Sequence, residues 1–398
     1  MAEPVGAMGV TEGTAGSTAV QDAPALEFVF SSEQRDLRAA VRDVLADRSD
    51  EAAVRRVMES GSGYDADLWA RLGGELGVLG LAVPEDRGGA GGTLVDQAVV
   101  AEEFGVALLP GPVLGTVGLA IPALVALGPG GEVDELLAAL VAGTRTGALV
   151  VPEPGVAPEV TAAGDALTGR LPRVVDGGAD VLLVAATGPD GFGLYATEGG
   201  DRTPLSTLDR TRRQAAVVFD ATPARLLAAG EAAERAVAHA LRVGGALLAA
   251  EQVGGAQRML DTTVAYANTR LQFGRKIGSF QAVKHRCADM LVLVEHARST
   301  AYHAAWALQD GSDDPDLAVS VAQAVCSENY QRVVQDAVQM LGGIGFTWEH
   351  PAHLYLKRAV TDAALLGGPA AHRDRIARLV LDTAVPTGTA TVADGRLT

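Results

Sequence analysis

YANTRLQFGRKIGSFQAVKHRCADM, the sequence from Tyr266 to Met290, decides the fold of this chain. From Val283 onward, within this stretch and after it, apolar residues recur at spacings of three and four, as a helix that buries one face requires. These residues are Val283, Cys287, Met290, Leu291, Val294, Ala297, Ala301, Ala304 and Leu308. The pattern predicts one long core helix that follows a turn near Gly274.

Three cations lie in this turn beside two glycines. They are Arg270, Arg275 and Lys276, close to Gly274 and Gly278. Because the whole chain carries a formal net charge of -17, a local group of cations next to accessible backbone suits an anion such as a phosphate. A solvated basic turn without a ligand is the alternative that these residues leave open.

The composition limits the partners of the chain. Its 398 residues predict two or three domains, and its residues are 48% hydrophobic but only 4% aromatic, which is typical of helix bundles rich in Ala, Val and Leu. The acidic balance argues against nucleic acid or an anionic membrane as the main partner. We therefore expect any anionic ligand to bind at a local basic site.

Several features predict a cytoplasmic protein. Cys287 and Cys326 both fall on apolar helix faces, so we expect reduced core residues and no disulfide or metal site. The first 25 residues lack the basic start and apolar run of a signal peptide. The uncharged segment 106–131 is interrupted by prolines and glycines, which favours a buried pair of short helices over a membrane span.

The period of the hydrophobic pattern divides the chain into an α+β fold. We expect a disordered tail over 1–27, a helical domain over 28–146, an antiparallel β domain over 147–223, a helical bundle over 224–384 and a loose tail over 385–398. Ser31 with Gln34 forms a capping-box pattern, and Asp314-Pro315 predicts another helix start. Paired glycines in QMLGGIGF predict where that second helix ends.

The order of the domains, the turn RLQFGRKIGSFQ and the later segment QMLGGIGFTWEHP together resemble the acyl-CoA dehydrogenase family. The resemblance covers roughly residues 28–384. It implies an N-terminal helical domain, a middle antiparallel β domain and a C-terminal four-helix bundle. It also implies FAD bound between subunits of a dimer or of a dimer of dimers.

The resemblance also implies which residues hold the coenzyme. Arg270 and Phe273, with Gly274 between the cations, would meet the pyrophosphate and adenine end of an FAD held mainly by a neighbouring subunit. Gln281, Gln339, Gly342 and Gly343 would lie at the same end of that flavin. Arginine suits this task because it offers a fixed fork to a phosphate diester, and glycine because it lets the backbone come close.

The carboxylate base of the family is missing from both of its known positions. The family abstracts a proton next to the thioester while a hydride passes to the flavin, and a glutamate is the base. Leu366, in LLGGPAAHR, and Gly244, in RVGGALLAAE, occupy the two positions that match. Glu251 is the best remaining acid as an unorthodox base, although a surface or interface charge is favoured for it. His372 and Arg373 are candidates for a CoA phosphate or for helix capping, and Asp362 and Glu349 are expected to be exposed.

The residues that face the flavin ring in the family are also replaced. Pro152 to Glu159 keep only part of the loop TEPGAGSD, and Arg173-Val174-Val175 stand where the family has Trp-Ile-Thr. No aromatic wall and no hydroxyl donor remain for the ring. The resemblance is therefore to a non-catalytic subunit of a heteromeric acyl-CoA dehydrogenase, of the kind that actinobacteria use on steroid side-chain CoA thioesters.

This interpretation predicts a heterotetramer of this chain with a homologous partner subunit. The partner would bind the acyl-CoA, and this chain would complete the partner's FAD site. A steroid ring system is one possible acyl group. Two alternatives stay open. One is a self-sufficient homotetramer with an unrecognised base, and the other is a homologue that binds acyl-CoA or flavin without turnover.

Overall fold

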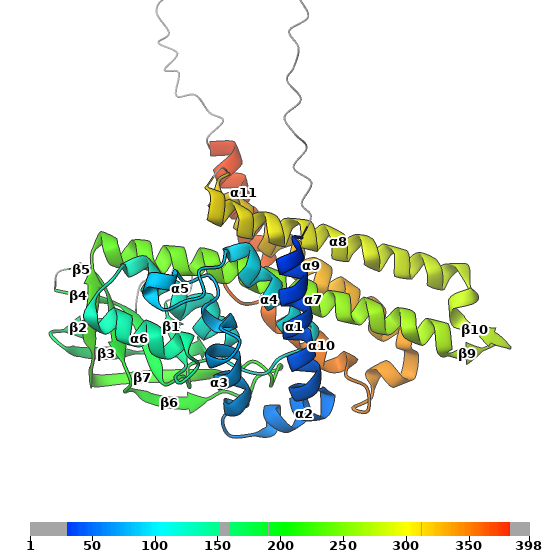
Figure 1. Cartoon of the computed structure of the whole chain (residues 1–398), viewed down its shortest axis with the longest axis horizontal. Helices are drawn as coiled ribbons and strands as arrows, with labels where there is room; N and C mark the ends of the chain where they lie inside the picture. Colours follow the sequence, from blue (N-terminus) through cyan, green and yellow to red (C-terminus); the bar gives the residue numbers. More distant parts are fainter. Residues whose placement is uncertain (1–29, 152–158, 190, 312, 383–398) are drawn as a thin grey trace, which may run out of the picture.

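The computed structural model describes residues 30–151, 159–189, 191–311 and 313–382 (Figure 1). The predicted tails and the loop 152–158 lie outside these residues. Helices form both ends of the chain and a sheet lies between them in sequence, so the predicted α+β fold and its three-part order are confirmed.

The N-terminal part is helical. Its elements are α1 (Ser32–Arg48), α2 (Glu51–Glu59), α3 (Ala66–Gly74), η1 (Val78–Gly80), η2 (Glu85–Arg87), α4 (Leu94–Val106), the π-helical η3 (Val113–Ala120), α5 (Ile121–Leu127) and α6 (Gly131–Val141). The capping box is confirmed, because Gln34 N donates to Ser31 Oγ at 3.2 Å and Ser31 N donates to Gln34 Oε1 at 3.1 Å. The uncharged segment forms η3 and α5, and every residue of η3 is buried. Within the described residues, no helix is long and apolar enough to cross a membrane.

The middle part is one eight-stranded sheet. Its strands are β1 (Gly147–Val150), β2 (Val160–Ala163), β3 (Ala166–Val175), β4 (Val181–Gly188), β5 (Gly191–Thr197), β6 (Asp201–Pro204), β7 (Gln214–Pro223) and β8 (Arg225–Ala229). The strand order is β6-β7-β3-β2-β4-β5-β8, and β1 pairs with β4. Most pairs are antiparallel, but β4 runs parallel to β1 and to β2. Strand β4 is central and nearly all of it is buried, as its apolar sequence VLLVAATG requires.

One strand differs from the sequence prediction. A helical period was expected from Ala224, but Arg225–Ala229 forms β8 and pairs with β5, and the next helix begins at Glu231. The sequence RLLAA suits a helix as well as a strand, so the pairing with β5 decides its structure.

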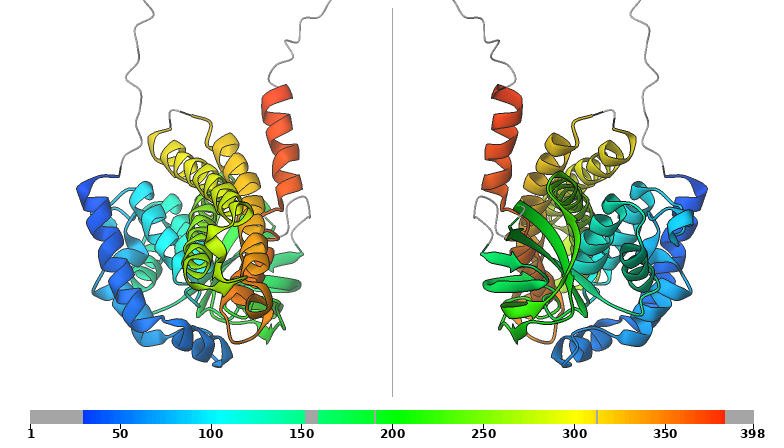
Figure 2. Two further views of the ribbon diagram at one scale, coloured as in Figure 1. Left: turned by 90° about the vertical axis from the view of Figure 1, so that its right-hand side faces the viewer. Right: turned by 90° about the vertical axis from the view of Figure 1, so that its left-hand side faces the viewer.

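The C-terminal part is a bundle of long helices. Its elements are α7 (Glu231–Thr269), β9 (Leu271–Gln272), β10 (Arg275–Lys276), η4 (Ile277–Ser279), α8 (Gln281–Asp310), α9 (Pro315–Leu341), η5 (Gly342–Phe346), α10 (Ala352–Asp362) and α11 (Pro369–Leu381). Helices α7, α8 and α9 pack together along the length of the molecule, and α11 stands away from its body (Figures 1 and 2). The predicted cap of α9 is confirmed, because Asp314 Oδ1 accepts from Asp316 N at 2.9 Å.

Two glycines bring α4 and α7 into backbone contact. A Cβ atom on Gly105 would lie 1.9 Å from the carbonyl oxygen of Glu251, and one on Gly254 would lie 1.9 Å from that of Glu102. No larger residue fits at either position without moving a backbone. This crossing fixes the bundle against the N-terminal helices.

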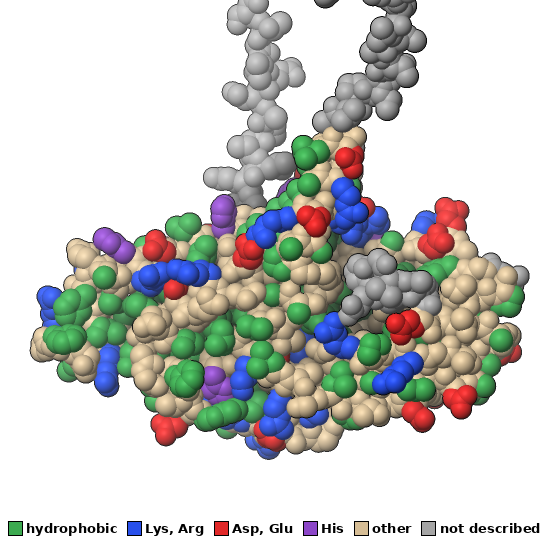
Figure 3. Space-filling view, turned by 180° about the vertical axis from the view of Figure 1, so that it is seen from behind, with side chains coloured by type: hydrophobic (Ala, Val, Ile, Leu, Met, Phe, Trp, Pro, Cys, Tyr) green, Lys and Arg blue, Asp and Glu red, His purple; other side chains and the backbone are tan. Residues whose placement is uncertain are grey.

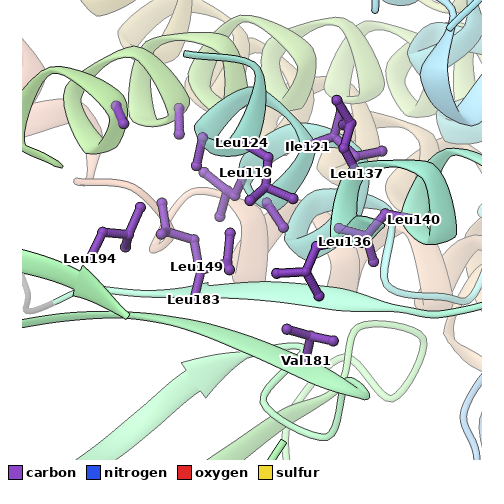
Figure 4. Close-up of a cluster of buried hydrophobic side chains, with 14 of the residues drawn as sticks. Leu119, Ile121, Leu124, Leu136, Leu137, Leu140, Leu149, Val181, Leu183 and Leu194 are labelled. Carbon is purple, nitrogen blue, oxygen red and sulfur yellow. The ribbon is translucent and has the colours of Figure 1, made fainter. Parts of the chain in front are cut away.

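A leucine-rich cluster joins the N-terminal helices to the sheet. Figure 4 shows side chains of η3, α5 and α6 facing those of β1, β4 and β5. The labelled members are Leu119, Ile121, Leu124, Leu136, Leu137, Leu140, Leu149, Val181, Leu183 and Leu194. This cluster fills the space between the layers next to the first half of α7.

Candidate functional site

The turn predicted near Gly274 is a tight β-hairpin. Strands β9 and β10 pair through Gln272 with Arg275, which leaves Phe273 and Gly274 as a two-residue turn. Both turn residues have left-handed backbones, with φ of 52° and 75°. Glycine adopts this conformation freely, but an aromatic residue pays a strain energy for it. The left-handed backbone of Phe273 therefore lowers the stability of the turn.

The hairpin presents apolar and cationic side chains to the outside. Phe273 is 90% exposed and Leu271 is 62% exposed. Arg270, Arg275 and Lys276 are also exposed, and none of them forms an ion pair with a residue that the structure describes. At the tip of this end, at the left of Figure 3, hydrophobic and cationic side chains lie next to each other. On a chain of net charge -17, this exposed group of cations and apolar side chains is the candidate anion site that the sequence predicts.

The second sequence motif lies at the same end of the molecule, as Figures 1 and 2 show for η5 and the hairpin. Gln339, Gly342 and Gly343 are exposed where α9 ends, and Gly342 has a left-handed backbone with φ of 64°. Gln281 is exposed at the start of α8. All seven residues predicted to contact FAD therefore lie on the outer surface of one end of the bundle.

Two more aromatic residues are exposed after the end of α9. Phe346 is 88% exposed and Trp348 is 67% exposed. The ammonium of Lys357 lies 4.2 Å from the centre of the Trp348 ring, and the His353 ring contacts its edge at 4.5 Å between centroids. Sequence reasoning missed Trp348, although it is one of only three tryptophans in the chain.

The first predicted base position is closed by the Leu119 side chain and the Gly118 carbonyl group. Gly244 lies on α7, and a Cβ atom there would come within 2.6 Å of Leu119 Cδ2 and 3.1 Å of the Gly118 carbonyl oxygen. The π-helical η3 thus packs directly on α7 at this point. A glutamate side chain has no room at Gly244.

The second predicted base position belongs to the same apolar region. Leu366 packs against the cluster that contains Leu119 and Leu194, and its backbone is left-handed with φ of 53°. Its carbonyl oxygen lies 3.1 Å from His372 Nε2. The structure therefore brings both predicted base positions to one leucine cluster.

The space beside these positions is almost filled. A cavity of about 10 Å³ remains between α4, η3 and α7, lined by residues that include Gln97, Phe104, Leu114, Gly118 and the one acid Glu251. This volume is at most that of one water molecule. An acyl chain does not fit there.

Gly244→Ala is expected to destabilise the chain by about 1–3 kcal/mol, because the added methyl group overpacks a site without free space. Urea unfolding measures the change. Gly131→Ala is the control, because a Cβ atom there meets nothing within 4 Å and the variant should be neutral or slightly more stable. Equal stability of the two variants would contradict the tight packing of η3 on α7.

The β-domain residues that replace the family's flavin-facing residues do not fit a flavin ring. Val174 is 4% exposed and Val175 packs against the leucine cluster. The loop 152–158 lies outside the described residues. Among the described residues of this segment, Val174 and Val175 of β3 are therefore used for packing.

A buried ionic network lies between the sheet and the bundle. Arg212 Nη2 lies 2.5 Å from Glu251 Oε1, and the same carboxylate pairs with Arg358. Arg358 Nε also donates to Asp209 Oδ2 at 2.6 Å, and Arg212 Nε lies 3.0 Å from Asp362 Oδ1. All five side chains are at most 5% exposed.

This network corrects two expectations about acidic residues. Glu251 is buried and not a surface or interface charge, and Asp362 is 0% exposed and not an exposed acid. Burial opposes the ionisation of Glu251, but the guanidinium groups of Arg212 and Arg358 outweigh burial and lower its pKa below the usual value. A catalytic base needs a raised pKa and access to substrate, so this geometry does not suit Glu251 as a base.

His372 and Arg373, the candidates for a CoA phosphate, contact other residues of this chain. His372 is 8% exposed near the start of α11, and Arg373 pairs with Glu328 on α9. The network residues Asp209, Arg212 and Arg358 were missed by sequence reasoning. The charged run Asp209 to Arg213 between two strands was the available signal, because such a run is usually solvated and here is partly buried.

The comparisons with known proteins show the family of the chain. Residues 31–144 match the N-terminal domain of acyl-CoA dehydrogenases, and residues 234–381 match their C-terminal domain. The chain is 39% identical over 351 residues to the acyl-CoA dehydrogenase IpdE2 of Mycolicibacterium smegmatis, which covers 88% of this chain and 98% of that protein.

Two solved structures of similar shape come from complexes of two different chains. A variant of the Tcur3481-Tcur3483 steroid ACAD has a TM-score of 0.79 and 34% identity, covering 88% of this chain and 98% of that one. The ChsE4-ChsE5 complex from Mycobacterium tuberculosis has a TM-score of 0.80 and 28% identity, covering 91% of this chain and 100% of that one.

Proposed function

Because this chain belongs to the acyl-CoA dehydrogenase family, we propose that it completes the FAD site of a homologous partner subunit and carries no catalytic base of its own. FAD is the cofactor of the assembly, and when bound it accepts the hydride in the α,β-dehydrogenation of an acyl-CoA thioester. This chain contributes positive charge and exposed backbone at the phosphate and adenine end.

The observation that carries the proposal is the separation of two sites along α7. Gly244 and Arg270 are 26 residues apart on one helix and its cap, which corresponds to roughly 39 Å. One bound dinucleotide does not span that distance. The hairpin therefore serves a flavin whose reactive ring lies on another subunit.

The sealed interior supports the second half of the proposal. Both base positions, Gly244 and Leu366, lie at the leucine cluster, and the small cavity between α4, η3 and α7 beside Gly244 does not admit an acyl chain. The thioester would thus bind mainly on the partner, which supplies the base. A self-sufficient enzyme would need another base, and Glu251 is unsuited because its carboxylate is buried and paired with two arginines, which lower its pKa and thus its affinity for a proton.

The type of assembly and the acyl group are part of the same proposal. We infer a heterotetramer of two copies each of this chain and its partner, because two similar structures are of two-chain complexes. One of those complexes is described as a steroid ACAD. A bulky steroid side-chain CoA thioester is accordingly the substrate class that we propose for the partner's pocket.

The test compares the full chain produced alone with the chain produced together with a homologous partner subunit. We expect the chain alone to hold little flavin and to leave it oxidised when an acyl-CoA is added. With the partner, we expect a yellow complex with one FAD for each pair of chains, bleached by the thioester. Bleaching by the chain alone would overturn the proposal and favour the self-sufficient enzyme, whereas flavin bound without any bleaching in either preparation would favour a binding protein.

A further inference from the structure

The buried ionic network joins all three parts of the chain. The loop before β7 supplies Asp209 and Arg212, α7 supplies Glu251, and α10 supplies Arg358 and Asp362. The N-terminal part is attached as well, because Arg358 Nη2 donates to the Leu109 carbonyl oxygen at 3.4 Å. Any change in the charge of this network therefore changes the stability of the contacts among these three parts.

The network contains more carboxylates than cations. A fourth acid, Asp176, lies next to it and accepts a hydrogen bond from Gly115 N at 2.9 Å. Asp176, Asp209, Glu251 and Asp362 thus stand against two guanidinium groups, and every one of these acids is at most 5% exposed. Burying two uncompensated negative charges is costly, so the interior favours the uptake of protons.

The hydrogen bonds indicate which acid takes up a proton. Asp209 accepts from Arg358 Nε at 2.6 Å and from Thr211 N at 2.8 Å, and Glu251 accepts from both arginines. Asp362 differs, because Arg212 Nε lies 3.0 Å from its Oδ1 without hydrogen-bond geometry, and neither oxygen accepts a hydrogen bond from any residue that the structure describes. An ionised carboxylate without hydrogen bonds is the least stable member of such a group.

We propose that Asp362 is a proton-storing carboxylic acid, neutral while the three parts are docked, so that the stability of the fold depends on pH near neutrality. The groups that face it are Asp209 and Arg212 before β7, Glu251 on α7, Tyr330 on α9 and Arg358 on α10. This inference concerns the fold of the chain and does not rest on the proposed function.

The pKa shifts support this assignment. Burial raises the pKa of Asp362 to about 7, and it raises the pKa of Asp176 to about 6. The ordinary pKa of an aspartate in the unfolded chain is 3.8. Between these values the folded chain holds a proton that the unfolded chain has lost, so stability falls as the pH rises and levels off above the folded pKa. One such proton changes the unfolding equilibrium constant by about tenfold for each pH unit.

The test is urea unfolding of the full chain and of Asp362→Asn from pH 5 to pH 8, with the partner subunit present if the chain needs it. Asparagine keeps the volume of the side chain but removes its titration. We expect the ratio of the unfolding constants, wild type over variant, to rise by up to tenfold for each pH unit to about pH 7. The ratio removes the opposite effect of histidines with lowered pKa values, such as His353 and His372. A ratio independent of pH would overturn the proposal.

A second measurement detects the proton directly, even if the variant does not fold. Difference infrared spectroscopy of the folded wild-type chain should show the stretching band of a buried carboxylic acid, which disappears as the pH rises through about 7. Asp362→Asn should lack the part of this band that disappears near pH 7, whereas a contribution of Asp176 should remain and disappear near pH 6. Asp43→Asn, at an exposed position of α1, should keep the whole band. Absence of the band from the wild-type chain at pH 6 would overturn the proposal.

Discussion

Replacing Glu251 with alanine is expected to lower the free energy of unfolding by about 3–5 kcal/mol, the cost of removing one partner from a buried ion pair. Glu251 Oε1 pairs with both Arg212 and Arg358, and each guanidinium group is at most 3% exposed. Without this carboxylate, both guanidinium groups lose the hydrogen-bond acceptor that they share, and ionisation of Asp362 restores charge balance but not these hydrogen bonds. Chemical denaturation at constant pH measures the loss.

The control lies on the same helix. Glu231 pairs with Arg235, but its side chain is 82% exposed, so Glu231→Ala should change the free energy of unfolding by less than about 1 kcal/mol. Glu251→Gln separates charge from volume, because it keeps the shape of the side chain. If Glu251→Gln folds as stably as the wild type, the charge of Glu251 does not hold the network together.

Arg270→Ala is expected to weaken FAD retention by the assembled complex by about 10- to 100-fold. A charge-assisted hydrogen bond to a phosphate contributes about 1.5–3 kcal/mol, which corresponds to this range. Arg270 is exposed and pairs with no carboxylate of the described residues, so its loss should leave the fold of this chain intact. Flavin counting after gel filtration measures the occupancy, and the unfolding midpoint of the variant measures its stability.

The control for Arg270 is an arginine at the opposite end of α7. Arg235→Ala removes an exposed cation there and should leave the FAD content unchanged. Phe273→Asn provides a complementary result, because asparagine adopts the left-handed backbone with less strain than phenylalanine. We expect this variant to be as stable as the wild type or more stable, and to retain less FAD. Full flavin occupancy in both Arg270→Ala and Phe273→Asn would show that the hairpin does not bind the coenzyme.

Local sequence rules predicted those elements whose signals are local. The cap at Ser31, the cap at Asp314 and the glycine stop at Gly342 each depend on a few neighbouring residues, and each is found in the structure. The long core helix after Gly274 follows from its apolar period and is found as α8. The hairpin around Phe273 and Gly274 was predicted only as a turn, because its register depends on backbone pairing.

The interior network could not be predicted in this way. Asp362 and Glu251 appear on helices like ordinary surface acids, and Arg212 belongs to a basic run between strands. Their burial results from contacts among segments far apart in the sequence, such as Arg212 with Asp362. The absence of a base could be inferred from Gly244 and Leu366, but only the structure shows that η3 fills the space beside them.

The backbone contact of α4 with α7 has a mechanical consequence. Gly254 lies at the crossing, and 15 residues of continuous helix, about 22 Å, separate it from Thr269 at the end of α7. The backbones of α4 and α7 touch at this crossing, so no side chains lie between them that could repack. Helix α7 is therefore held in a fixed position against α4. The hairpin at the end of α7 can change its position only if the N-terminal helices move with it. The position at which this hairpin meets a neighbouring subunit therefore depends on the packing of the whole chain.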